Sequence, residues 1–185
     1  MYQLHTLPRA IGLTTLAIAA ATFATAPAKA ANGTSTGTIS ISLNVGASCQ
    51  INGAAMAANV GQVGAIAFPD QSGIFGDTSA QLVATGGGNA ISILCSPGQT
   101  PTLTFGTGAN DNGGVHRMAS GGNFLPYHLF SDPAATNELT INKQISLGTA
   151  TTTAFSVPVY AHTNSGGVVL AAGAYTDTVQ VTLAW

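Results

Sequence analysis

The chain has 185 residues, of which 45% are hydrophobic and only 5% are charged, with a formal net charge of −2. Four Lys and Arg residues cannot neutralise a run of phosphates or hold a protein on an anionic lipid surface, so composition excludes nucleic acid and lipid headgroups as main partners. A sheet surface built from Thr, Ser, Asn and Gly carries little charge repulsion against joining another sheet edge, which suits assembly.

The N-terminus is typical of a secretory signal peptide over residues 1–30. Arg9 supplies a positive charge, residues 11–26 are apolar and uncharged, and Ala28-Lys29-Ala30 is a small-x-small cleavage site. A transmembrane anchor is the alternative, but this apolar run is shorter than the roughly 20 residues needed to span a bilayer. We therefore expect a secreted protein without direct membrane insertion after signal removal, whose residues 31–185 suffice for one domain.

Residues 37–45 predict a strand with one apolar face, because side chains alternate between the two faces of a strand. Its apolar positions are Ile39, Ile41, Leu43 and Val45. A similar pattern, interrupted by Asp177, closes the chain. Its apolar positions are Tyr175, Val179, Val181, Leu183 and Trp185. One amphipathic strand is therefore expected at each end of the exported part.

Cys49 and Cys95 are the only cysteines, and both lie in the exported part. In an oxidising compartment they are expected to form one disulfide, worth roughly 3 to 4.5 kcal/mol in the chain-entropy model. No C-x-x-C or C-x-x-H spacing indicates a metal site.

Between the two end strands, short strand patterns are separated by Gly, Pro, Asn and Ser clusters. They fall at residues 50–56, 62–68, 78–84, 90–95, 102–105, 115–119, 123–130, 154–160 and 168–170. Pro158 predicts an edge strand because it has no N–H to donate, and residues 106–114 predict a polar loop. No sustained helical period follows residue 30, so the expected fold class is an all-β sandwich.

Catalytic chemistry has little support. A G-x-S-x-G match at residues 33–37 lacks the strand and helix that a nucleophile elbow needs. His116, His128 and His162 have no second ligand at metal-binding spacing and are expected at the surface or in loops. Asp111 is expected in a solvated loop, since the EF-hand spacing for calcium is missing. No catalytic, cofactor-binding or metal-binding residue is predicted, and the chain is not expected to be an enzyme.

Several segments, in their order and spacing, resemble the spore coat U domain family. The chain is most similar to the major-type pilin subunits of archaic (Csu-type) chaperone-usher pili. The matching segments are TGTISISLNVGASC (residues 36–49), GGNAISILC (87–95), LPYHLFSDPAATN (125–137), VPVYAH (157–162) and GAYTDTVQVTLAW (173–185).

This resemblance implies an incomplete immunoglobulin-like β-sandwich over residues 49–185 that is completed by a donor strand from a neighbouring subunit. It assigns the donor strand to residues 31–48, with Ile39, Ile41, Leu43 and Val45 facing the acceptor. It places an acceptor groove, which also binds the chaperone, beside Tyr175, Val179, Val181, Leu183 and Trp185. The family disulfide corresponds to Cys49 and Cys95.

The function implied is that of a structural pilus subunit, polymerised by donor-strand exchange, that serves surface adhesion and biofilm formation. Its partners would be neighbouring copies, a periplasmic chaperone and an outer-membrane usher, and it would pass through the periplasm to the cell-surface pilus. One alternative is a single-domain adhesin at or near the fibre tip, and another is a secreted hydrolase. Neither alternative comes with residues that support it.

Overall fold

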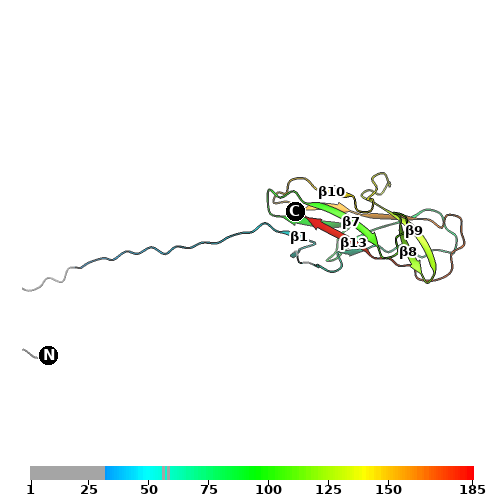
Figure 1. Ribbon diagram of the computed structural model, residues 1–185, viewed down its shortest axis with the longest axis horizontal. Coiled ribbons are helices and arrows are strands. Elements are labelled where there is room, and N and C mark those ends of the chain that lie inside the picture. The colour runs from blue at the N-terminus through cyan, green and yellow to red at the C-terminus, as the bar shows by residue number, and fades with distance from the viewer. Residues whose placement is uncertain (1–31, 56, 58) are drawn as a thin grey trace, which may run out of the picture. The chain divides into compact units, whose positions relative to one another are not determined.

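Thirteen strands form in the computed structural model, which describes residues 32–55, 57 and 59–185 (Figure 1). The predicted signal peptide lies outside the described residues. In chain order the strands are β1 (Cys49–Ile51), β2 (Ala54–Ala55), β3 (Gly64–Ala65), β4 (Thr78–Gln81), β5 (Val83–Ala84), β6 (Ala90–Cys95), β7 (Thr102–Gly108), β8 (His116–Ser120), β9 (Asn123–Phe130), β10 (Gln144–Ser146), β11 (Phe155–Pro158), β12 (Tyr160–Thr163) and β13 (Val179–Ala184).

All strand pairs are antiparallel and form four sheets. Two sheets have four strands, in the orders β11-β6-β1-β2 and β4-β12-β9-β8. A third has the order β10-β7-β13, and β3 pairs with β5. All thirteen strands lie within residues 44–185, which form one compact unit.

One hydrophobic core draws side chains from every sheet. Ile93 of β6, Phe105 of β7, Leu129 of β9 and Ala84 of β5 are all buried in the same cluster. Alternation along each strand explains this, since β6 and β9 bury every second residue. The fold is therefore an all-β sandwich, as the strand patterns predict.

Two predicted strands, residues 90–95 and 123–130, have the bounds of β6 and β9. The predicted strand at 154–160 is divided, because the chain leaves one sheet after Pro158 and enters another at Tyr160. The buried Val159 lies at this crossing. Pro158 does belong to an edge strand, β11, as expected from its missing N–H.

Other boundaries differ from the prediction. Strand β7 continues through Gly108 into the predicted loop 106–114, because β13 pairs with it that far. The predicted strand 78–84 is interrupted at Leu82, between β4 and β5. The last strand is shorter than residues 175–185, with an isolated bridge from Thr176 to Ala119 before β13 begins. Residues 37–45 form no strand, since nothing in the described chain pairs with them.

The predicted disulfide is confirmed and joins two neighbouring strands. Cys49 of β1 lies directly opposite Cys95 of β6 in the antiparallel register, and their sulfur atoms are bonded. Both residues are buried in the core. The two bonded cysteines are 46 residues apart in the sequence, and strands β2 to β5 lie in the loop between them.

Replacing both cysteines with Ser is expected to lower the free energy of unfolding by about 2 to 4 kcal/mol, because the unfolded chain regains the freedom that this loop loses. Urea unfolding followed by circular dichroism measures the change. As a control, reductant should lower the midpoint of the native protein and leave that of the double variant unchanged. Equal urea midpoints for the native protein and the double variant, both measured without reductant, would contradict a stabilising role of the disulfide.

Candidate functional site

One edge of β13 has no strand partner. Its other edge pairs with β7 from Val179 to Ala184, and Figure 1 shows β13 (red) beside β7 (green). Within the part of the chain that the structure describes, the sheet ends at β13. A strand edge of this kind presents unpaired N–H and C=O groups, which are a template for pairing with another chain.

A large groove of about 1200 Å³ adjoins this edge. Its lining includes residues 175–183 with Trp185, and also residues 59–66 with Phe68. No backbone hydrogen bond joins β13 to residues 59–68 in the described chain. The groove therefore lies between two segments that do not pair with each other through backbone hydrogen bonds.

The base of the groove consists of core residues. Phe105, Leu129 and Val159 line it and are at most 5% exposed, and Leu82 and Ala161 lie beside them. Among the described residues of the lining, Asp177 is the only charged one. The lining thus combines buried core residues with polar residues such as Gln62, Thr107 and Gln180.

The five residues assigned to the acceptor groove from sequence all lie in its lining: Tyr175, Val179, Val181, Leu183 and Trp185. Val179 and Val181 are half-buried and Leu183 is buried, whereas Gln180 and Thr182 between them are exposed. This alternation turns one face of β13 toward the core. Trp185 at the chain end remains 46% exposed.

The four residues assigned to the donor strand are strongly exposed. Ile39, Ile41, Leu43 and Val45 have between 85% and 91% of their surface accessible to solvent. Each exposed aliphatic side chain forgoes about 1.5 to 3 kcal/mol that burial would provide. An alternating row of four such side chains is an unusual surface for a soluble protein to expose.

Sequence reasoning missed the part of the lining that precedes β4. Val60, Val63, Ile66 and Phe68 are half-buried and pack against the core. Their segment contains only the two-residue strand β3, so its apolar residues do not share one strand face. The mixed pattern of residues 62–68 predicted a strand but gave no sign that this segment borders a groove.

His116 and Asp111 depart from the prediction, since neither lies at the surface. His116 is 4% exposed and the Asp111 side chain 10%. Asn112 and Val115 exchange backbone hydrogen bonds of 3.1 Å across Gly113-Gly114, whose φ values of 58° and 79° fit a two-residue hairpin turn. This hairpin brings Asp111 opposite His116, with Oδ1 and Nδ1 3.0 Å apart.

The other two histidines in the described part of the chain, His128 and His162, lie apart from this pair. His128 is exposed, as expected, and contacts Glu138 at 2.6 Å. His162 is half-buried in β12, opposite His128 in the strand register. The Gly113-Gly114 pair is a signal for a two-residue hairpin turn, and from it the proximity of residues 111 and 116 could have been predicted.

Asp177, which interrupts the apolar row of the last segment, is a hydrogen-bond acceptor. The Tyr127 hydroxyl donates to its Oδ2 at 2.7 Å, and the backbone and side-chain N–H groups of Asn110 donate to its Oδ1 at 3.1 Å. Burial, and then the hydrogen bond to Asp177, raise the pKa of Tyr127 far above its ordinary value, so that the hydroxyl stays protonated as a donor.

Gly108 leaves room for both carboxylates. A Cβ at this position would lie 2.7 Å from Asp111 Oδ1 and even closer to Asp177 Oδ2. Gly108→Ala is therefore expected to lower the free energy of unfolding by about 1 to 3 kcal/mol, the usual cost of overpacking. Urea midpoints measure it, with Gly76→Ala as the control because its Cβ would meet nothing within 4 Å. A midpoint for Gly108→Ala equal to that of the control would contradict the close packing.

Comparison with protein families matches residues 19–182 to the spore coat protein U domain. The match covers the whole sandwich except the last residues, and it includes the segment with the exposed aliphatic row. No curated protein in the comparison matches the chain.

Proposed function

The chain belongs to the spore coat protein U domain family, and we propose that it is a structural pilus subunit that joins its neighbours by donor-strand exchange. Proteins with this domain are secreted surface proteins of the pilus or coat type, not enzymes, and pilus subunits of the family assemble with a chaperone and an usher. In this proposal residues 31–48 are the donor segment and residues 49–185 the receiving domain.

The observation that carries the proposal is a complementary pair of surfaces in one chain. One is the apolar groove beside the unpaired edge of β13. The other is the exposed aliphatic row Ile39, Ile41, Leu43 and Val45. Strand addition uses both kinds of feature, because main-chain hydrogen bonds supply affinity and pockets for alternate side chains supply specificity.

Length and charge of the two surfaces agree. At roughly 3.3 Å per residue, residues 37–45 extend over about 30 Å and the groove-lining residues 175–185 over about 36 Å. The donor row carries no charge, and the groove has only Asp177, near one end of this segment. A slip of one residue would turn Thr38, Ser40, Ser42 and Asn44 into the apolar groove, so the register is expected to be strict.

Burial of four aliphatic side chains gives an upper estimate of roughly 6 to 12 kcal/mol per joint. The contact is heterologous, because the donor segment of one subunit enters the groove of the next. Such contacts need not close into a ring and generate filaments when they do not. A fibre of this kind would extend from the cell surface and serve adhesion and biofilm formation.

An open groove also explains the need for a chaperone. The lining of the groove includes many apolar residues, and an apolar groove beside a strand edge without a partner promotes aggregation. We infer that a periplasmic chaperone covers the groove until, at the outer-membrane usher, the donor segment of the next subunit replaces it.

The proposal is tested by electrophoresis of unheated surface extracts in detergent, where joined subunits migrate as a ladder. Donor-face variants, described in the Discussion, should lose the ladder. Labelled antibody against the subunit should decorate the fibre shaft. Labelling confined to fibre ends would favour a tip adhesin instead and contradict the role of shaft subunit.

A further inference from the structure

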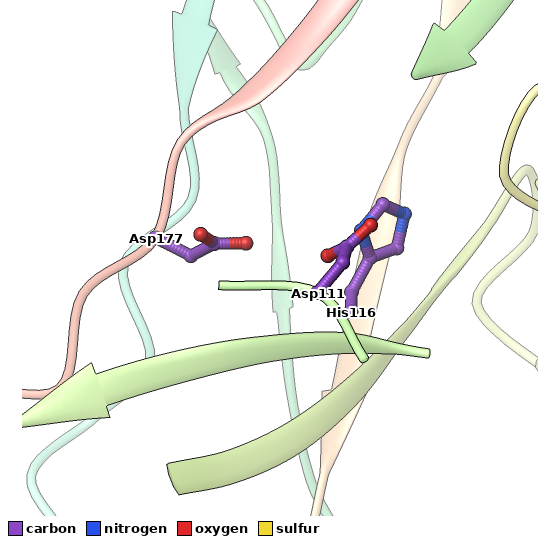
Figure 2. Close-up of side chains that lie close together, drawn as sticks. All are labelled: Asp111, His116 and Asp177. Carbon is purple, nitrogen blue, oxygen red and sulfur yellow. The ribbon is translucent and has the colours of Figure 1, made fainter. Parts of the chain in front are cut away.

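Three side chains of metal-binding type meet near one end of the segment that precedes β13. Ligand atoms of Asp111, His116 and Asp177 all lie within 4.8 Å of one another. The Gly113-Gly114 hairpin brings the first two together, whereas Asp177 belongs to the last segment of the chain, far from them in the sequence. Figure 2 shows the carboxylates of Asp111 and Asp177 pointing toward each other, with the His116 ring beside Asp111.

Two members of this group, Asp111 and His116, each have a buried side-chain atom without a hydrogen-bond partner among the described residues, and for His116 this atom is Nε2. The Asp111 side chain is nine-tenths buried, and Oδ1 contacts His116 Nδ1, but the buried Oδ2 has no hydrogen-bond partner. A buried acceptor without a partner costs about 1 to 3 kcal/mol, and more when it is charged. The nearby Asp177 carboxylate adds repulsion between like charges. A bound cation would compensate for both effects.

The surroundings hold the ligands in place. Tyr127 and Asn110 fix the Asp177 carboxylate by hydrogen bonds, and the Tyr127 ring stacks on His116 with centroids 5.3 Å apart. Each carboxylate oxygen that accepts one hydrogen bond keeps a further lone pair for a metal ion. Such orienting contacts around the ligands are typical of metal sites.

We propose that Asp111, His116 and Asp177 form a binding site for a divalent transition-metal ion of the zinc type. One imidazole nitrogen with two carboxylates suits Zn²⁺, whereas Ca²⁺ prefers oxygen ligands alone. Tetrahedral ligand bonds of about 2.0 to 2.2 Å place adjacent ligand atoms about 3.3 to 3.6 Å apart, so Asp111 Oδ1 and His116 Nδ1, now 3.0 Å apart, would move apart slightly to hold the ion.

This site would tie the hairpin after β7 to the segment before β13, independently of the donor residues. The secreted protein, purified without a polyhistidine tag and freed of metal by chelation, is titrated with ZnCl₂ by calorimetry. We expect one ion per chain and a Tm rise of roughly 5–10 °C at a hundredfold excess over Kd. Ca²⁺ at the same concentration should bind at least tenfold more weakly.

Asp111→Asn is the most informative variant, because Oδ2 has no partner to lose. It should weaken Zn²⁺ binding at least tenfold while the circular dichroism spectrum is retained. Asp70→Asn and His128→Gln change an exposed carboxylate and an exposed imidazole and serve as controls that keep full binding. If Asp111→Asn does not fold, the visible spectrum of the Co²⁺-loaded native protein decides, since nitrogen and oxygen ligands in an ordered site give intense bands.

Two results would overturn the proposal: no saturable Zn²⁺ binding by the native protein, or binding that persists in Asp111→Asn and disappears in His128→Gln. Stronger binding of Ca²⁺ than of Zn²⁺ would overturn the assigned class of ion. None of these readouts depends on polymerisation, so failure here is distinguishable from failure of the proposed pilus function.

Discussion

Simultaneous replacement of Ile41 and Leu43 with Asp should abolish the detergent-resistant ladder of surface extracts and leave subunits of monomer size. Both side chains are strongly exposed, at 91% and 86%, so the subunit itself loses no packing. In a joint, however, two aliphatic contacts disappear and two carboxylates meet an apolar groove. Lost burial alone amounts to about 3 to 6 kcal/mol, a more than hundredfold loss in joint stability.

The matched control places the same two charges on the opposite face of the segment, as Ser40→Asp with Ser42→Asp. Those side chains point away from the acceptor when the apolar row points into it, so the ladder should remain. The Tm of either double variant should stay close to that of the native subunit. An intact ladder from the Ile41 and Leu43 variant would exclude residues 37–45 as the donor strand.

Val181→Asp should have a comparable effect from the other side of the joint. Val181 lines the groove from β13 and is only half-buried in the free domain. The new carboxylate therefore stays partly hydrated until a strand fills the groove, and then loses its water at a cost of several kcal/mol. We expect at least tenfold less complex with the chaperone and at least tenfold less subunit in fibres.

Ala184→Asp is the control for this change, because Ala184 also belongs to β13, is exposed on its other face and does not line the groove. Co-purification with the chaperone measures the first step, and quantitative blotting of surface extracts measures the second. If Val181→Asp entered fibres as well as Ala184→Asp did, the groove would not be the acceptor.

A structural feature could be predicted from the sequence where residues close together in the chain determine it. Strands β6 and β9 were predicted with their bounds, because alternation and apolar, β-branched and aromatic residues extend unbroken to their turns. The break at Val159 was not predicted, since the strand pattern continues through it while the chain changes sheets. Periodicity records which residues are buried and does not record which sheet buries them.

The groove shows the same limit. The apolar row of the last strand could be predicted from its alternation, but a groove is a property of distant segments that do not meet, such as β13 and residues 59–68. Residues 37–45 have the pattern of a half-buried strand, and no local feature shows that their own chain provides no partner for them. The resemblance to pilins supplied that expectation.

The Asp111 and His116 pair was missed for a more specific reason. A ligand spacing of two or four residues does not cover this pair, because a two-residue hairpin places residues five apart in the sequence opposite each other. Asp177 was noted only as an interruption of an apolar row. Its partner Tyr127 lies 50 residues away in the sequence, so its role as a buried acceptor required the folded structure.

The disulfide has a mechanical consequence if subunits are linked through their N-terminal segments. Tension along a fibre would then enter each folded subunit at Cys49, the first residue of the three-residue strand β1. Hydrogen bonds of so short a strand would open one after another under load. Because Cys49 is bonded to Cys95 of the neighbouring strand β6, the force also passes covalently into β6 and not only through the hydrogen bonds of β1.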